Sequence, residues 1–257
     1  MPLQTIDRTL DVLAAFGAKQ EFGVSEMARA VGLPKSATHR ILSTLTQRGF
    51  LEQGENHRYR LGLKVLELGN ACRLRMELAT VAQPILQSLS VQANCNSHLA
   101  KLDGLEVVDV LRAEYPAPFR IGRTAMLRRP AHCTALGKAL LAFSDGPVAA
   151  EVISAGLPRL TPYTITRPER FLSELARIRQ RGYAVDNEEF YAGRRCLAAP
   201  VFDEHRRAVA AISISAMITE ITEDRVPAYG AMVVESASEI STQLGYRGAP
   251  VRNAGFR

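Results

Sequence analysis

The first 61 residues carry three short helical patterns followed by two short strand patterns, an order that few small folds accommodate. Apolar side chains recur at three- and four-residue spacing over residues 3–14, which predicts an amphipathic helix ending near Gly17. Residues 24–32 predict a second helix of about two turns with Ser25 as its N-cap. A third helix is expected from Pro34 to about residue 48, because proline is favoured in the first helical turn.

Two strand patterns follow the third helix. Phe50–Gln53 and Arg58–Leu61 read as strands joined by a polar turn, which predicts a β-hairpin. Three helices and a hairpin in this order describe a winged helix-turn-helix, a fold that places the second helix of its helical pair in a groove of DNA.

Residues 64–91 are expected to be helical again, with a break near Pro84, and to link the N-terminal module to the rest of the chain. We place the boundary near residue 75, which gives a domain of residues 1–75 and a second of residues 76–257. Four leucines of this linker exceed the needs of a small N-terminal core, so we expect part of a dimer interface here: Leu63, Leu66, Leu74 and Leu78.

The second domain mixes strand and helix patterns. The expected fold class is therefore α+β, with an antiparallel sheet flanked by helices. Strands are expected at 96–102, 106–112, 197–202 and 209–215, and helices at 136–143, 168–180 and 224–244.

Positive charge gathers near the N-terminal end of a chain whose net charge is +6. Between Pro34 and Lys64, six basic residues meet only Glu52 and Glu55, a net charge of +4 in this segment. Such a basic stripe is typical of phosphate binding, although a solvated basic face is the alternative.

Other classes of protein are disfavoured by composition. No segment approaches the roughly 18 apolar residues of a membrane span, and residues 1–8 lack the apolar run of a secretory signal, so we expect a cytoplasmic protein without membrane contact. The four cysteines form no C-x-x-C and are expected to be reduced. A zinc site using Cys95, His98, His132 and Cys133 is a weaker alternative, because no close ligand pair has structural-zinc spacing. We expect neither a metal nor a cofactor.

The third predicted helix divides into an apolar face and a small polar face. Ser36, His39, Arg40 and Ser43 share the polar face, where an arginine can bind guanine through two hydrogen bonds. The residues expected to contact phosphate are Lys35 and Thr38 near the helix start and Arg58 and Arg60 of the hairpin. The alternative is an ordinary surface helix in a three-helix module.

The sequence resembles the IclR family of bacterial transcriptional regulators along nearly its whole length. The motifs that carry the resemblance are the stretches 7–13, 31–42 and 59–62 in the N-terminal domain, and 130–142, 181–189 and 196–203 in the second domain. Their order and separations are specific to the family.

The resemblance implies a GAF-like C-terminal domain that binds a small organic acid, and a homodimer or homotetramer on a palindromic operator. It also implies DNA contact by Arg8. The pocket positions of the family fall on Ala135, Leu136, Asp186, Cys196, Ser213 and Ser215. The glyoxylate- and pyruvate-sensing members have Gly and Ala where this chain has the bulkier Ala135 and Leu136, which argues against those effectors.

The residues themselves support this site in part. Ser213 and Ser215 share one face of a strand, so both hydroxyls can point into a pocket while Ile212 and Ile214 face the other layer. We expect the N–H groups of residues 134–136, from Thr134 on, to hold a carboxylate at a helix start without any buried Lys or Arg.

For each of these side chains the sequence leaves an alternative. Asp186 is expected to accept a hydrogen bond from a ligand hydroxyl, or it belongs to an exposed acidic loop. The two serines lie in a pocket or on a solvated sheet face. Cys133 and Cys196 are expected to be small buried side chains, and contact with a ligand is the second alternative.

A catalytic function has little support, because the chain lacks the nucleophile elbow, the phosphate-binding loop, the dinucleotide fingerprint and the His-Glu-x-x-His motif. We expect a DNA-binding transcriptional regulator, a repressor of a catabolic or uptake operon that responds to a small carboxylic or sugar acid. The alternatives are an enzyme on a small organic acid with an appended nucleic-acid-binding module, and an architectural DNA binder that senses nothing.

Overall fold

The computed structural model describes residues 4–54, 56–74, 77–115, 128–144 and 147–248. The described chain divides into two units, the first up to residue 74 and the second from Glu77 onward. Each unit has hydrophobic clusters of its own. We call the first the winged unit and the second the sheet unit.

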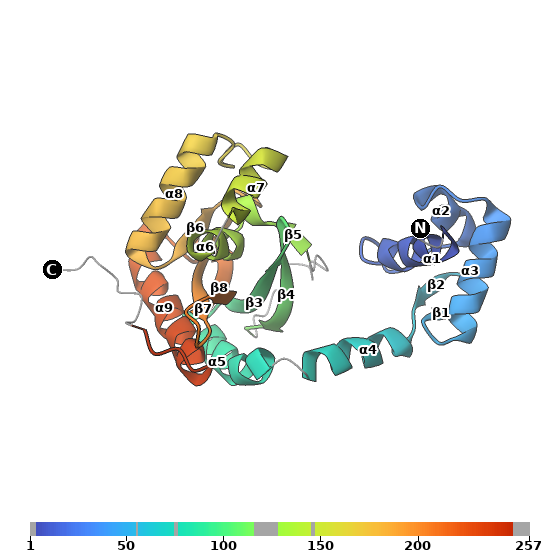
Figure 1. Ribbon diagram of the computed structural model, residues 1–257, viewed down its shortest axis with the longest axis horizontal. Coiled ribbons are helices and arrows are strands. Elements are labelled where there is room, and N and C mark those ends of the chain that lie inside the picture. Colours follow the sequence, from blue (N-terminus) through green and yellow to red (C-terminus); the bar gives the residue numbers. More distant parts are fainter. Residues whose placement is uncertain (1–3, 55, 75–76, 116–127, 145–146, 249–257) are drawn as a thin grey trace. The chain divides into compact units, whose positions relative to one another are not determined.

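The winged unit packs three helices against a hairpin (Figure 1). The helices are α1 (Gln4–Ala15), α2 (Val24–Ala30) and α3 (Lys35–Gln47), and the antiparallel hairpin is β1 (Leu51–Gln53) with β2 (Tyr59–Leu61). The buried members of its core are Val12, Phe16, Phe22, Met27, Leu42, Leu45, Leu51 and Tyr59. On α3 the predicted apolar face is the one that is buried, but on α1 the expected face is wrong, because Ile6 and Leu10 are exposed and Val12 is buried. The winged helix-turn-helix is confirmed.

The start of α2 differs from the expectation. Ser25 lies inside the helix, and the N-cap is Gly23, whose N–H donates to the Glu26 carboxylate at 3.1 Å. The Glu26 side chain thus satisfies the N–H of the N-cap residue, as the third residue of a helix does in a capping box. The helix ends before Gly32, which has φ +66°, a conformation that favours glycine.

The linker is helical, but its break lies elsewhere. Helix α4 (Leu63–Leu74) and helix α5 (Glu77–Ala93) are separate, and Pro84 lies inside α5. The expected break at Pro84 is wrong because α5 buries a long apolar face in the sheet unit, and this burial outweighs the cost of about 3 kcal/mol for a proline inside a helix. Leu78 belongs to that buried face and is not free for a dimer interface, and the side chain of Leu74 lies outside the described residues.

The sheet unit contains a six-stranded antiparallel sheet in the order β5-β4-β3-β8-β7-β6. The expected antiparallel sheet is confirmed, and β5 and β6 are additional short strands at its two edges. The strands are β3 (Asn96–Asp103), β4 (Glu106–Ala113), β5 (Arg128–Pro130), β6 (Ala184–Asn187), β7 (Arg194–Phe202) and β8 (Ala208–Met217).

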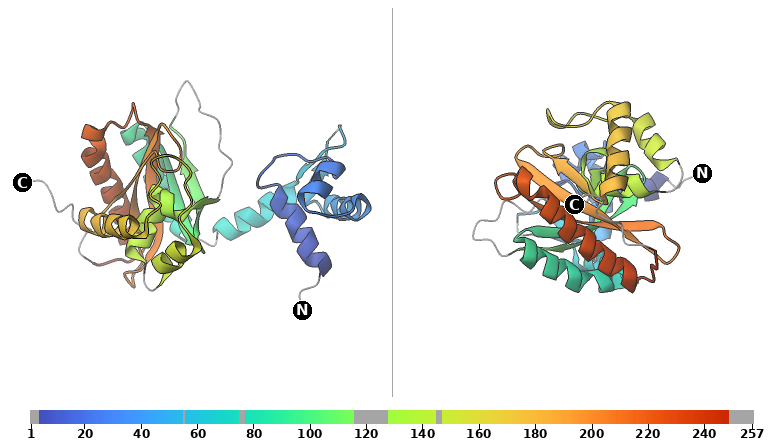
Figure 2. Two further views of the ribbon diagram at one scale, coloured as in Figure 1. Left: turned by 90° about the horizontal axis from the view of Figure 1, so that it is seen from above. Right: turned by 90° about the vertical axis from the view of Figure 1, so that its left-hand side faces the viewer.

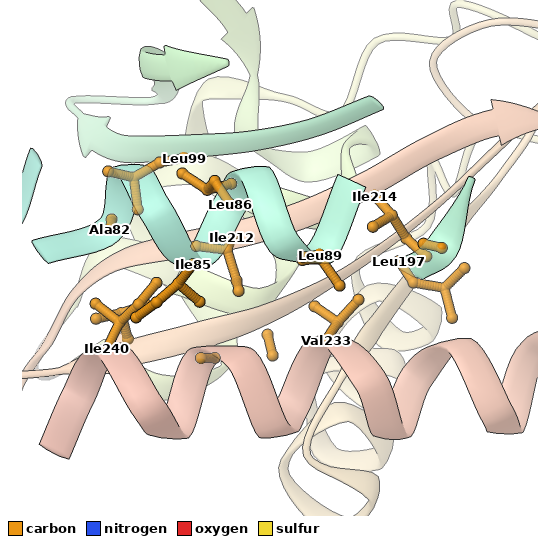
Figure 3. Packing of buried hydrophobic residues seen from close by; sticks show 14 of the residues in the cluster. Ala82, Ile85, Leu86, Leu89, Leu99, Leu197, Ile212, Ile214, Val233 and Ile240 are labelled. Atoms are coloured by element: carbon orange, nitrogen blue, oxygen red, sulfur yellow. The ribbon is translucent and has the colours of Figure 1, made fainter. Parts of the chain in front are cut away.

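Helices cover both faces of this sheet (Figure 2). On one face, α5 and α9 (Val226–Gln243) pack against apolar side chains of the central strands, including Leu197, Ile212 and Ile214 (Figure 3). The other face is covered by α6 (Ala135–Phe143), α7 (Val148–Ala155) and α8 (Pro168–Arg181). On this second face the sheet contributes small residues, since its core members include Ala100, Ala184, Ala198 and Ala211.

Ile212 and Ile214 therefore face α5 and α9, as the two-residue period predicted, and the alternating residues of β8 face α6. In the part of the chain that the structure describes, no helix is long and apolar enough to cross a membrane.

Candidate nucleic-acid interface and ligand site

The polar face of α3 lies on the surface of the winged unit. Ser36, His39 and Arg40 are exposed and Ser43 is half-buried. Lys35, also exposed, lines a surface depression between α2 and α3 together with Ser25 and other residues of the two helices. The structure thus brings these predicted residues together on one helix face, with the helix N-terminus beside the depression.

Thr38 does not belong to this face. Its side chain is fully buried, and its hydroxyl donates to the carbonyl of Pro34 at 3.1 Å. The expected phosphate contact by Thr38 is therefore wrong. Helix α3 turns this side chain toward the core beside Leu42, and its hydroxyl makes its hydrogen bond inside the first turn.

The two hairpin arginines are paired with carboxylates. The Arg58 guanidinium donates to Glu26 at 2.7 Å and to the carbonyl of Glu21 at 3.2 Å, and Arg60 donates to Glu52 at 3.1 Å. Arg58 therefore ties the second strand of the hairpin to the start of α2. Arg8, the remaining predicted DNA contact, is exposed on α1.

Glu26 is held in its charged form by several partners. A hydrogen bond from the Gly23 N–H, one from Lys19 and the Arg58 guanidinium lower the pKa of the Glu26 carboxyl to about 2. The cluster of Lys19, Glu26 and Arg58 is thus an ion-pair network that fixes the wing against α2.

The predicted ligand residues of the sheet unit form a row across the face under α6. Asp186 on β6 is directly opposite Cys196 on β7, and Cys196 is directly opposite Ser215 on β8. The Cys196 thiol donates to the Ser215 hydroxyl at 3.3 Å, and Ser213 lies two residues further along the same face. Ser213, Ser215 and Asp186 are all buried, which removes the alternatives of a solvated serine pair and an exposed acidic loop.

The start of α6 adjoins this row. Thr134 is the N-cap, and its hydroxyl accepts from the Gly137 N–H at 3.2 Å, while Ala135 and Leu136 are buried. Helix α6 packs on β6, β7 and β8, the strands that carry the row. The structure therefore brings all seven predicted ligand residues to one region of the sheet unit.

Burial governs the ionisation of this region. Oδ1 of Asp186 accepts from the N–H groups of Glu189 and Phe190 at 2.8 and 3.3 Å, yet burial raises the pKa of this carboxyl to about 7. Burial also raises the pKa of the Cys133 and Cys196 thiols to about 12. Both cysteines are neutral, and Asp186 lies near its midpoint of ionisation at neutral pH.

The sequence-based reasoning missed a buried ion pair beside Asp186. Lys138 of α6 is fully buried and bonds to the Glu189 carboxylate, and its ammonium also donates to the carbonyl of Val185 at 2.6 Å. The signal was present, because Lys138 is the single charged residue in the apolar run of α6.

A second missed group lies on the strands beyond Ser213. His98 on β3, Asp109 on β4 and Arg129 on β5 share the face that carries Ser213, and the Arg129 guanidinium bonds to the Asp109 carboxylate. Charged residues in otherwise apolar strands were the available signal. Among the described residues, no group of three or more His, Cys, Asp or Glu side chains could hold a metal ion.

These two sites define a class of protein: a helix-turn-helix regulator that binds DNA through one unit and carries a separate sheet unit. Residues 5–55 match the model of the IclR helix-turn-helix domain, and residues 72–242 match that of the bacterial transcriptional regulator IclR C-terminal domain. The chain belongs to the IclR family of bacterial transcriptional regulators, as its motifs indicated.

Proteins similar to this chain are named as transcriptional regulators. The chain is 34% identical to the HTH-type transcriptional regulator KdgR of Dickeya chrysanthemi (96% of this chain, 82% of the relative) and 35% identical to the transcriptional repressor IclR of Escherichia coli (95% and 90%). It is also similar to an IclR homologue from Microbacterium hydrocarbonoxydans, solved with 4-hydroxybenzoate, with a TM-score of 0.81, 29% identity and coverage of 93% and 98%. The chain is a DNA-binding transcriptional regulator, and the enzyme alternative is set aside.

Proposed function

We propose that this regulator represses a catabolic or uptake operon in the cytoplasm and is controlled by a small carboxylic or sugar acid. The observation that carries the proposal is the buried row of Asp186, Cys196, Ser213 and Ser215 beside the start of α6. Buried hydroxyls and a carboxylate aligned on one sheet face suit an oxygen-rich ligand. The names of relatives as repressors and the hydroxybenzoate complex of a homologue support the sign and the ligand class.

On DNA, the exposed side chains of α3 contact base edges in this proposal. His39 and Arg40 read bases with help from Ser36 and Ser43, while Lys35 binds phosphate at the start of the helix. Arg8 and Arg60 add contacts at the edges of the interface, and Arg58 acts by holding the wing. Two winged units of a homodimer or homotetramer engage the two halves of a palindromic operator.

In the sheet unit, the ligand takes hydrogen bonds from the hydroxyls of Ser213 and Ser215 and from the N–H groups that follow Thr134. Asp186 accepts from a ligand hydroxyl, since one of its oxygens already receives two backbone N–H groups and the carboxylate would repel a ligand carboxylate. Ligand binding favours one state of the protein by the difference in its affinity for the states that do and do not bind the operator.

The test combines operator binding with the site variant Ser213→Ala/Ser215→Ala. DNA fragments from upstream of the gene and its neighbours are titrated with wild-type protein, with and without a panel of organic and sugar acids. We expect at least one acid to weaken binding to its operator fragment, and the double variant to lose this response while keeping the operator affinity measured without ligand. Ser173→Ala, an exposed serine on α8, is the matched control and keeps the response.

Two outcomes contradict the proposal. Operator binding that no acid changes identifies an architectural DNA binder. Equal affinity of wild type and double variant for the best acid, measured by calorimetry, moves the ligand site away from β8.

A further inference from the structure

We infer that Arg129, which flanks Asp109 together with His98, is the cationic end of the effector site and binds the carboxylate of the effector, whose hydroxyl then points toward Asp186. The inference rests on the proposed function and adds the charge and the orientation of its ligand. It also replaces the sequence-based expectation that a carboxylate is bound without any buried arginine.

The polar row continues beyond the predicted ligand residues onto β3, β4 and β5. His98 on β3 is directly opposite Ser213 on β8, so the row continues from the predicted ligand residues without a gap. Asp109 and Arg129 extend it over β4 and β5 on the same face, since the alternating neighbours Ala100 and Val107 belong to the core under α6. Residues from six neighbouring strands thus form one polar strip on a sheet face that is otherwise lined by small apolar residues.

Two buried nitrogen atoms at this end of the strip have no hydrogen-bond partner. His98 is 8% exposed, and its Nδ1 is buried with no hydrogen-bond partner, 3.6 Å from the nearest oxygen of Asp109. Nε of Arg129 is also buried without a partner, although another nitrogen of the same guanidinium bonds to Asp109. A buried polar group that lacks its hydrogen bond is costly, and two such groups on either side of Asp109 indicate that a ligand atom completes them.

The charged side chains of the strip lie toward its two ends. Arg129 provides a planar set of donors that matches a carboxylate, while Asp186 lies at the opposite end of the strip. Burial lowers the pKa of His98, so the imidazole is neutral at pH 7 and Arg129 carries the positive charge. Nε of Arg129 can therefore donate to a carboxylate in a charge-assisted hydrogen bond while another nitrogen of the guanidinium stays bonded to Asp109.

The spacing of the strands sets the size of the ligand. The distance from β3, which carries His98, to β7, which carries Cys196, is two strand spacings, or roughly 10 Å. Arg129 on β5 bonds to Asp109 on the neighbouring strand β4, and His98 lies on the other side of Asp109. The span suits a small hydroxylated acid whose carboxylate lies on the side of His98 and Arg129 and whose oxygen substituent lies toward Cys196.

The experiment compares acids with their uncharged amides by calorimetry. The first probes are gluconate with gluconamide and 4-hydroxybenzoate with 4-hydroxybenzamide, followed by the same pairing for every acid of the panel that binds. Wild type is expected to prefer the acid by a factor on the order of 10 to 100, the range of a hydrogen bond to a charged group. Arg129→Gln is expected to lose this preference while its affinity for the amide stays unchanged.

Arg128→Gln is the matched control, because Arg128 is the neighbouring residue on the same strand and pairs with the exposed Asp103. It should keep the acid preference. Asp109→Asn/Arg129→Gln replaces the ion pair by two neutral side chains and gives a second test if the single variant unfolds, with thermal melting as the measure of folding.

The outcomes separate this inference from the proposed function. If a wild-type acid preference is absent, or if it persists in both Arg129 variants, Arg129 does not bind the carboxylate, and the repressor with its serine site still stands. If no acid of the panel binds and none changes operator binding, both ideas fail together.

Discussion

At the level of single residues, the positive charge of the winged unit is divided between side chains that are free for DNA and side chains that are already paired. Lys35 and Arg40 are exposed on α3, and within the described residues neither forms an ion pair. Arg58 and Arg60 are instead bound by carboxylates. Removal of Lys35 or Arg40 should therefore affect DNA binding differently from removal of Arg58 or Arg60.

Arg40→Ala should reduce sequence specificity, and Lys35→Ala should weaken binding to all DNA. Loss of a two-bond contact between arginine and guanine costs about 1–3 kcal/mol at a single base position, whereas loss of a phosphate contact is independent of sequence. Fluorescence anisotropy with operator and scrambled duplexes at several salt concentrations measures both effects. An equal loss on both duplexes for Arg40→Ala would make Arg40 a phosphate contact.

Glu26→Gln should destabilise the winged unit at neutral pH but not in acid. The folded-state pKa of Glu26 is lowered to about 2 from a normal value of 4.5, chiefly by the Gly23 N–H and by Lys19, so the stabilisation is complete above about pH 4.5 and is lost as the pH falls through about 2. Thermal melting of wild type and variant over this range should show two curves that converge in acid. Glu52→Gln, at the exposed pair with Arg60, is the control; a difference between wild type and Glu26→Gln that does not depend on pH would refute the network.

At the level of elements, the ligand region depends on how α6 is fixed to the edge of the sheet. Lys138 reaches from α6 to the carbonyl of Val185 on β6 and to Glu189 in the following turn. The same turn donates two N–H groups to Asp186. One buried cation thus fixes the helix start and the turn that orients the acidic end of the strip.

Lys138→Met should destabilise the sheet unit by about 3–5 kcal/mol, because it leaves Glu189 buried without its cation. Lys138→Met/Glu189→Leu should recover much of this loss, since no unpaired charge remains. Chemical denaturation followed by far-UV circular dichroism measures both. The exposed pair of Lys64 and Glu67 provides a control in which Lys64→Met changes stability by less than about 1 kcal/mol. A double variant as unstable as the single one would show that the lost packing of the lysine stem dominates.

At the level of the whole molecule, the winged unit leaves apolar side chains uncovered on two of its helices. Leu63 and Leu66 of α4 are 68% and 60% exposed, and Ile6 and Leu10, one turn apart on α1, are 53% and 57% exposed. Such surfaces on a small unit favour association with a second copy, and a two-fold pair of winged units suits a palindromic operator.

Leu10→Glu/Leu66→Glu should convert a wild-type homo-oligomer into a monomer. The operator affinity should fall by roughly a hundredfold, because linked second binding events contribute about that factor. Leu172→Glu, at a 51% exposed leucine of α8 in the sheet unit, is the control. Sedimentation velocity at micromolar concentration measures the assembly, and a monomeric wild type with full operator affinity would contradict the proposed oligomer.

The helices, the hairpin and most of the sheet could be predicted from the amino-acid sequence, because their apolar periods and turn residues are local. The sequence also determined the family, through motifs spread along the chain, and it placed Ser213 and Ser215 on one face of a strand. The short edge strands β5 and β6 were missed because runs of 3 and 4 residues are too short to show a period.

Which polar side chains contact one another depends on how the strands and helices pack. His98 and Ser213 are more than a hundred residues apart in sequence and directly opposite each other in space, since β3 and β8 are neighbours in the sheet. The burial of Thr38 and the capture of Arg58 by Glu26 likewise depend on contacts between elements. A charge pattern in sequence carries no record of its partner, because ion pairs and burial arise only when distant segments pack together.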